Sequence, residues 1–492
     1  MTKSRALRGV AGLLVLTACG TTVFSRTIEP AGAPSIEPTS VKEQQLSKGT
    51  QQAVNLARGA LQLVGAQRCA KNSDPDHGFT ATSMKWGTII PLTGALRPLG
   101  EQTARVMQVA VQYLNSVTSV PGGFDWGCPT RPGIWGRTVD LKILSLNQNT
   151  QDEAAAAMRH LIDVDHVFLV RDCYLESNLM SPATAYQNSQ HVPGIWCYSS
   201  YWPFPSLAPW NYAPGTDLMK VAAIHTGYLM NTLKRKKLAI LTDPSLMDSE
   251  VKVAKQIYRY INHYDIPERC VVPTRAQDAP GGMQSQVQQI RTCYSDLTPK
   301  APSPDAVLAL DALNGVFGAI SANNAGWQMY SASNPGGPQW SCATCWVQAL
   351  ADVCKAACDG MITDCQALPC IPWSTLPAAK TLEGIRSRYL PNEPKDVLTY
   401  GPMAITLGLG LWLGMTGPNL SRSALIHTVG SLHNWDAGIG PILNTNASDH
   451  FGGKAIWLLK FLNVGGIDGF TDYTGHFVTL TDVRVPVSLT TT

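Results

Sequence analysis

The amino-acid sequence predicts an α/β protein built from two doubly wound parallel-sheet lobes. Three observations predict this fold class. Short apolar segments alternate with helical segments over about 240 residues after residue 84, which is typical of parallel sheets with right-handed crossovers. A Trp- and Pro-rich segment, 201–210, interrupts the alternation and marks a natural lobe boundary. The chain also has 492 residues and 45% hydrophobic content, enough for two cores.

The first β-α unit lies between residues 86 and 115. Gly87–Ile90 is a short apolar run, as expected for a parallel strand that is covered on both faces. Prolines and glycines then break the chain before apolar residues recur at helical spacing. In open α/β sheets, the loops at the carboxyl ends of the strands face the ligand crevice. The loop Leu92–Gly100, which contains Arg97 and Leu99, is therefore a candidate wall of a binding site.

Later units follow the same alternation. The segments with strand character are Thr138–Leu144, Val167–Val170, Gly194–Cys197, Leu238–Leu241, Cys270–Val272 and Ala306–Leu310. The segments with helical character are Asp152–Leu161, Leu179–Gln187, Asp217–Leu233, Ser249–His263, Gln284–Tyr294 and Gly315–Asn323. This order predicts one sheet before the boundary at 201–210 and a second sheet after it.

The N-terminus carries an export signal. Basic residues at 3, 5 and 8 precede the apolar run Gly9–Leu16, and Leu16-Thr17-Ala18-Cys19 matches a bacterial lipobox. We expect a signal peptide at 1–18 and a lipid on Cys19, which would hold the chain on the extracytoplasmic face of the cell membrane. Residues 19–83 begin rich in Thr, Ser, Pro and Glu, and are expected to form the lipidated tether.

Composition narrows the function classes. The net charge of +3 is expected to be spread without basic blocks, so nucleic acid is not an expected partner. No apolar run after the N-terminus is long enough to predict a membrane-spanning helix; the richest one, Met403–Met415, is too short. The ten histidines are scattered, with no pair at metal-ligand spacing on a helix, and neither a metal nor a cofactor is expected. The C-x2-C and C-x3-C spacings within 339–372 superficially resemble a zinc site, but disulfides are favoured in an exported chain.

Cysteine usage agrees with export. Without Cys19, twelve of the thirteen cysteines remain, an even number that favours disulfides in an oxidising compartment. Six of them cluster in 339–372, which is expected to be an insertion with three disulfides, whose connectivity stays open among fifteen pairings. These six are Cys342, Cys345, Cys354, Cys358, Cys365 and Cys370. For the others, the suggested pairs are Cys173 with Cys197, Cys270 with Cys293, and Cys69 with Cys128.

The first unit resembles a known family. Pro91-Leu92-Thr93-Gly94, Gly100-Glu101, Ala110 and Asn115 fall into the register of type I periplasmic binding proteins, the branched-chain amino-acid and amide-binding family. Met107 stands near where that family often has Gly. Three later segments are similar to the family as well: 236–258, 304–327 and 380–411.

The resemblance implies a domain arrangement and a function. Lobe 1 would comprise 84–201 and 373–455, lobe 2 would comprise 202–338 and 456–484, and a three-segment hinge would join them. A small solute would bind between the lobes, with no bond chemistry and no cofactor. The expected partner is an ABC-type importer, to which the closed protein delivers its solute.

The resemblance also places candidate ligand contacts. In lobe 1 the loops 171–177 and 197–201 would face the solute, and they contain Tyr174, Tyr198, Ser199, Ser200 and Tyr201. Tyr174 stands where a small hydroxyl residue is common in the family, between Asp172 and Glu176. We infer that the solute is not a simple aliphatic amino acid. The aromatic side chains, with Trp202, would suit a planar, sugar-like or cationic group.

In lobe 2 the candidates are Asp243, Met247, Asp311 and Asn314. An Asp after a strand is as often a helix N-cap as a ligand contact, so both roles stay open for the two aspartates.

Two other functions stay possible from the sequence. A stand-alone envelope sensor or interaction protein could keep the same fold, and the tether and cysteine cluster favour it somewhat. An exported hydrolase would need a nucleophile and a base in the cleft, and Ser199 and Ser200 are the residues that would test it. The Gly408–Gly414 motif lies inside a helical apolar run, so a dinucleotide site is not expected.

Overall fold

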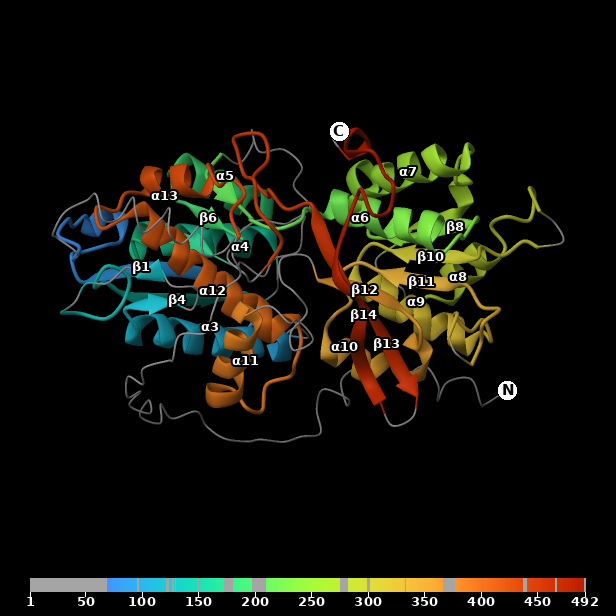
Figure 1. The fold of residues 1–492 in the computed structure, drawn as a ribbon, viewed down its shortest axis with the longest axis horizontal. Coiled ribbons are helices and arrows are strands. Elements are labelled where there is room, and N and C mark those ends of the chain that lie inside the picture. Colours follow the sequence, from blue (N-terminus) through green and yellow to red (C-terminus); the bar gives the residue numbers. More distant parts are fainter. Residues whose placement is uncertain are drawn as a thin grey trace.

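The computed structural model describes residues 69–490. Within that range it leaves out 95–96, 121–123, 126–127, 129, 148–149, 172–179, 197–208, 275–281, 299–300, 332, 366–376, 437–439 and 465–466. The chain forms two α/β lobes side by side, with lobe 1 at the left and lobe 2 at the right of Figure 1. The predicted signal peptide, Cys19 and the tether up to residue 68 lie outside the described residues.

Lobe 1 is built on a five-stranded parallel sheet with the order β4-β1-β5-β6-β7. Its strands are β1 (Ser83–Ile90), β4 (Thr138–Ser145), β5 (Leu169–Arg171), β6 (Gly194–Ile195) and β7 (Asn211–Tyr212). β1 is almost wholly buried and pairs with β4 over its full length. An apolar strand covered by helices on both faces has this burial pattern.

Helices cover both faces of the lobe 1 sheet. α3 (Arg97–Ser116) and α12 (Val397–Thr416) pack together on one face, where Val106, Ala110 and Leu409 join the core. On the other face lie α4 (Gln151–Arg159), η2 (His160–Val164) and α5 (Met180–Ser189). The remaining lobe 1 elements are η1 (Pro75–His77), β2 (Ser119–Val120), β3 (Phe124–Asp125), α11 (Pro377–Tyr389) and α13 (Arg422–Val429).

Lobe 2 is built on a seven-stranded mixed sheet with the order β14-β13-β12-β11-β10-β8-β9. Five strands are parallel: β8 (Leu238–Thr242), β9 (Val271–Pro273), β10 (Ala306–Ala309), β11 (Gln339–Cys342) and β12 (Ile362–Cys365). The hairpin of β13 (Ala455–Val464) and β14 (Ile467–Thr479) adds an antiparallel edge, seen in red in Figure 1. Mixed sheets of this kind are common among large α/β domains.

The helices of lobe 2 also form two layers. α6 (Leu218–Gly227), η4 (Tyr228–Thr232), η6 (Met247–Val251) and α7 (Lys252–Asn262) lie on one face. The other helices packed in this lobe are α8 (Gln284–Arg291), α9 (Ala312–Asn324), α10 (Gln348–Cys354) and η9 (Lys355–Cys358). Three short turns complete it: η5 (Pro244–Leu246), η7 (Glu268–Cys270) and η10 (Val487–Leu489).

The predicted insertion at 339–372 is wrong. This segment supplies β11 and β12, two buried inner strands of the lobe 2 sheet. Each strand has only four residues, which is too few to show a strand period. The cysteines around the strands indicated a disulfide-rich insertion instead. The expected lobe boundaries shift too. β7 belongs to the lobe 1 sheet, so lobe 1 extends past residue 201. The tether ends before residue 69, because Ala70 and Phe79 pack into the lobe 1 core.

α12 is the one helix, in the part of the chain that the structure describes, that is long and apolar enough to cross a membrane. The most apolar stretch of this helix is 78% buried inside the protein. A helix that is apolar on all sides is expected where protein surrounds it. α12 is therefore the core helix of lobe 1.

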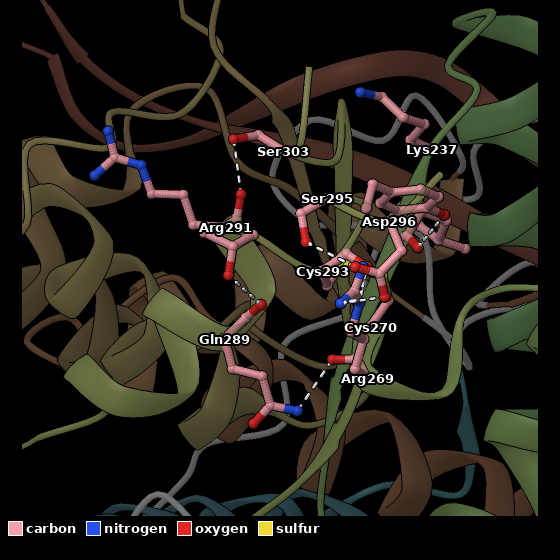
Figure 2. The surroundings of a disulfide bond; sticks show 12 residues. Lys237, Arg269, Cys270, Gln289, Arg291, Cys293, Ser295, Asp296 and Ser303 are labelled. Atoms are coloured by element: carbon pink, nitrogen blue, oxygen red, sulfur yellow. Dashed lines mark hydrogen bonds and ion pairs between the residues drawn. A yellow bond between two sulfur atoms is a disulfide. The ribbon is translucent and has the colours of Figure 1, made fainter. Parts of the chain in front are cut away.

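Four disulfides connect described cysteines: Cys69–Cys128, Cys270–Cys293, Cys342–Cys345 and Cys354–Cys358. The first two are pairs suggested from the sequence. Cys365 is also disulfide-bonded, and Cys173, Cys197 and Cys370 lie outside the described residues. Figure 2 shows Cys270–Cys293, which joins the turn before β9 to the end of α8. Arg269 supports this link by pairing with Asp296 at 2.7 Å.

Candidate ligand cleft between the lobes

The carboxyl ends of the strands in both lobes meet at the junction between them. The carboxyl end of β7 leads into α6 of lobe 2, and that of β12 leads toward α11 of lobe 1. A third crossing enters β13 from lobe 1. In open α/β sheets ligands bind outside the carboxyl ends of the strands. The junction is therefore the candidate cleft, and it has the three crossings expected from the sequence.

Two of the crossings form a tightly paired ribbon, which we call the hinge ribbon (211–217 and 450–455). The amide of Ala213 donates to the carbonyl of His450 at 3.1 Å, and that of Gly453 donates to the carbonyl of Gly215 at 2.7 Å. The Tyr212 ring stacks on His450 with 4.0 Å between centroids. A Cβ on Gly453 would lie 2.4 Å from the Gly215 backbone. Only glycine allows this close approach.

Charged side chains are buried beside the hinge ribbon. Lys220 donates to the carboxylates of Asp217 and, at 3.4 Å, Asp449, and so joins the first strand of the ribbon to the residue directly before the second. Burial alone would lower the pKa of Lys220, but these two carboxylates outweigh burial, and its pKa is raised. Glu250 on η6 is 1% exposed. Its burial, with a smaller contribution from nearby Asp217, raises its pKa to about 7.

A second contact between the lobes, which we call the clasp, lies at the N-terminus of α12. The Asp396 carboxylate caps α12 and accepts hydrogen bonds from the Gln102 side chain and the Gln348 amide, both at 3.1 Å. Gln348 begins α10 in lobe 2, whereas Gln102 and Asp396 belong to lobe 1. The Trp346 ring of lobe 2 also stacks on Tyr400 of α12, with 6.3 Å between centroids. Apart from one backbone hydrogen bond, from the Val397 amide to the Trp346 carbonyl at 3.3 Å, the clasp holds the lobes together through contacts of side chains.

The structure brings together three of the four lobe 2 candidates. Asp311 caps α9, accepting from the amides of Asn314 at 2.8 Å and Asp243 at 3.2 Å. The Asn314 side chain donates to Asp311 and to the carbonyl of Thr274. Burial, with repulsion from Asp243, raises the pKa of Asp311 to about 6. Asp311 therefore has the N-cap role that the sequence left open. Met247 lies apart, lining a shallow hollow on α7 with Lys252 and Arg259.

The lobe 1 candidates are less completely described. Arg97 is exposed and pairs with Glu101 one helical turn on, at 2.6 Å, and Leu99 is half-buried. Tyr174, Tyr198, Ser199, Ser200 and Tyr201 lie outside the described residues. Two cleft-edge residues were not predicted as contacts. Thr93 donates to the carbonyl of Leu146 at 3.0 Å. Arg171, buried at the end of β5, donates to Thr406 and to the carbonyl of Pro402 on α12.

Solved structures match this arrangement. A possible leucine/isoleucine/valine-binding protein from Rhodopirellula baltica has a TM-score of 0.61 at 15% identity, over 82% of this chain and 99% of its own. A fatty acid ABC transporter substrate-binding protein from Thermomonospora curvata has a TM-score of 0.62 at 18% identity, over 85% and 98%. A branched-chain amino acid binding protein from Streptococcus pneumoniae, solved with isoleucine, has a TM-score of 0.58 at 12% identity, over 80% and 100%. No family model and no curated protein matches the chain.

The chain has the type I periplasmic-binding-protein fold. At identities of 12–18% the likeness establishes the fold, which is the fold that the resemblance of the sequence predicted. The matched proteins are described as binding proteins, not as enzymes.

One buried cluster in this periplasmic-binding-protein fold resembles catalytic machinery. His225 on α6 lies 2.6 Å from the Ser341 hydroxyl of β11 and 3.0 Å from the Asp364 carboxylate of β12. All three residues are at most 3% exposed, so the cluster is closed to solvent and ties α6 to two inner strands. Among the described residues, no group of three or more His, Cys, Asp or Glu could hold a metal ion.

Proposed function

We propose that the chain is a solute-binding protein on the outer face of a cell membrane, and that it delivers a small molecule to an ABC-type importer. The observation that carries the proposal is the meeting of the strand carboxyl ends of both lobes at a junction crossed three times by the chain. Several structures with this fold are described as substrate-binding proteins of ABC transporters, which supports the importer as partner.

The mechanism follows from the two kinds of contact between the lobes. The hinge ribbon keeps its backbone hydrogen bonds while the lobes rotate, and the clasp opens or closes at the other contact. A solute that contacts both lobes favours the closed arrangement by its extra contacts there. Binding energy is converted into closure, and no covalent step is required.

The solute class is proposed from the sequence of the lobe 1 loops. Tyr174, Tyr198 and Tyr201 supply rings for stacking or cation–π contact, and Ser199 and Ser200 supply hydroxyl groups. Asp243, at the carboxyl end of β8, adds a half-buried carboxylate from lobe 2. These groups favour a planar, sugar-like or cationic solute over an aliphatic amino acid.

A thermal-unfolding screen tests solute binding. Amino acids, amides, polyamines, sugars and nucleosides would be added in turn to the oxidised protein. A ligand at a hundred times its dissociation constant adds about 2.7 kcal/mol to the folded state, which should raise the midpoint by several degrees. Tyr174→Ser and Tyr198→Ser should abolish the shift, while Tyr260→Ser, exposed on α7, should preserve it. A folded sample that responds to no class would contradict solute binding and support the envelope sensor.

Two further experiments test location and partner. Cys19→Ala should release the protein from the membrane fraction if lipid on Cys19 is its anchor. Deleting the protein should abolish uptake of the solute found in the screen. Uptake that continues at the normal rate would overturn delivery to an importer while leaving solute binding intact.

A further inference from the structure

One end of lobe 2 carries an unusual concentration of positive charge. Lys234, Arg235, Lys236 and Lys237 follow one another just before β8, a basic run that contrasts with the even spread of charge expected from the sequence. Because they precede β8, they lie at the amino-terminal ends of the strands, opposite the candidate cleft. Lys460 of β13 joins them through the ring of Tyr330. We call these five residues and Tyr330 the basic pole.

Two cations of the basic pole share one aromatic ring. The Arg235 guanidinium lies 5.0 Å from the centroid of Tyr330, and the Lys460 ammonium lies 5.5 Å from the same centroid. Lys460 is also 5.5 Å from the ring of Tyr473. The rings compensate part of this charge, but two cations held at one ring still repel each other. An anion placed between them would remove that repulsion.

The acidic residues at this end of lobe 2 are already engaged. Asp305 accepts hydrogen bonds from the amides of Lys236 and Lys237, at 2.8–3.0 Å. Asp296 pairs with Arg269 at 2.7 Å (Figure 2), and Asp265 pairs with Arg259 at 3.7 Å. Among the described residues, Lys234, Lys236 and Lys460 have no acidic partner within ion-pair distance. The exposed ammonium groups of Lys234 and Lys236 are therefore available to a ligand.

An exposed tyrosine lies next to these cations. Tyr264 is 43% exposed, and its hydroxyl donates to the carbonyl of Lys236 at 2.8 Å. Tyrosine is enriched where a protein meets a membrane, because its ring enters the apolar boundary while its hydroxyl stays in water. Cations beside such rings suit a surface of phosphate headgroups better than a single soluble anion.

We propose that the basic pole docks lobe 2 onto an anionic phospholipid surface. Lys234, Lys236 and Arg235 would contact lipid phosphates, with guanidinium and ammonium groups as donors, while Tyr264 would enter the headgroup region. The cleft at the opposite strand ends stays accessible. The inference rests on the proposed position outside a membrane, where one lipid anchor and a basic patch together hold a protein more firmly than either does alone.

Vesicle sedimentation tests the pole separately from the anchor. The chain from residue 19, with Cys19→Ser so that no lipid is attached, would be mixed with phosphatidylcholine vesicles with and without phosphatidylglycerol. We expect binding that requires phosphatidylglycerol and decreases steeply with salt. Lys234→Glu with Lys236→Glu should lower the partition coefficient at least about tenfold, and Tyr264→Ser should lower it less. Lys252→Glu with Lys380→Glu, which makes the same charge change at exposed sites elsewhere, should have little effect.

Three outcomes would overturn the inference. The two double variants could weaken binding equally, which would show that binding depends on the net charge of the protein and not on the basic pole. Binding to pure phosphatidylcholine could equal binding to the anionic vesicles. Inorganic phosphate could bind at the pole and stabilise the protein while vesicles do not, which would identify a soluble-anion site. None of these depends on the solute screen, so failure of the docking inference and failure of solute binding can be told apart.

Discussion

The hinge ribbon and the clasp both connect the lobes, but they are built from different groups. The ribbon pairs backbone amides with backbone carbonyls, from Ala213–His450 to Gly453–Gly215. The clasp has a single backbone bond, Val397–Trp346, and otherwise depends on the Asp396 carboxylate and on the stacked rings of Trp346 and Tyr400. Backbone groups must stay paired in a buried site, whereas side chains can exchange partners with water as the lobes separate. We therefore expect bending at the ribbon and opening at the clasp.

The largest effect should come from removing the cation beside the ribbon. Lys220→Met leaves the buried Asp217 and the half-buried Asp449 carboxylates without their cation, which should lower the free energy of unfolding by about 3–5 kcal/mol. The matched control is Lys142→Met, because the Lys142–Asp140 pair at 3.0 Å is 35% and 52% exposed. It should cost less than about 1 kcal/mol. Equal losses in urea unfolding would show that Lys220 does not support the ribbon.

Buried Glu250 should make stability near the ribbon depend on pH. Its pKa of about 7 in the folded protein exceeds the ordinary glutamate value of 4.5, so the fold favours the neutral acid. Glu250 thereby contributes about 3 kcal/mol to the free energy of unfolding. This contribution is fully present below pH 4.5 and is lost as the pH rises to about 7. Asp311, with a pKa of about 6, contributes with the same sign. Urea unfolding at several pH values should show that the free energy of unfolding decreases less with rising pH in Glu250→Gln than in the original protein. An unchanged pH dependence would refute the assignment.

A methyl group in the ribbon should separate its strands. Gly453→Ala places a Cβ 2.4 Å from the Gly215 backbone and should cost about 1–3 kcal/mol. Gly384→Ala in α11 is the matched control, since a Cβ there has nothing within 4 Å. It should stabilise the protein by up to about 1 kcal/mol, because Ala favours the helix. Thermal unfolding should therefore shift in opposite directions, and two shifts of the same sign would contradict the close approach.

The smallest effect should come from the clasp. Asp396→Asn replaces one carboxylate oxygen with an NH₂ group, which cannot accept from the Gln102 side chain or the Gln348 amide. Losing one such bond should cost about 1 kcal/mol of local stability. Hydrogen exchange at the Gln348 amide should therefore become about fivefold faster. Exchange at Gly215 in the ribbon should stay unchanged. If both amides exchange faster by the same factor, the clasp and the ribbon open together.

Much of the fold follows from local patterns. The apolar run Gly87–Ile90 and the helical spacing after Gly100 predicted β1 and α3, whose bounds differ by a few residues. The N-cap alternative for Asp311 also came from its position directly after a strand. These features depend on residues close in sequence, which is why a single chain suffices to predict them.

Other features depend on residues far apart in the sequence. Whether the segments Gln339–Cys342 and Ile362–Cys365 become inner strands is decided by partners such as β10 and β13, because four residues are too few to show a period. The meeting of Asp396 with Gln348, and of Arg235 with Lys460 at Tyr330, joins segments that no local pattern relates. The sequence by itself determined the alternation of strands and helices and the resemblance, and it predicts the export signal. Tertiary packing decided the strand order, the hinge ribbon, the clasp and the basic pole, because long-range pairing sets which ends and surfaces meet.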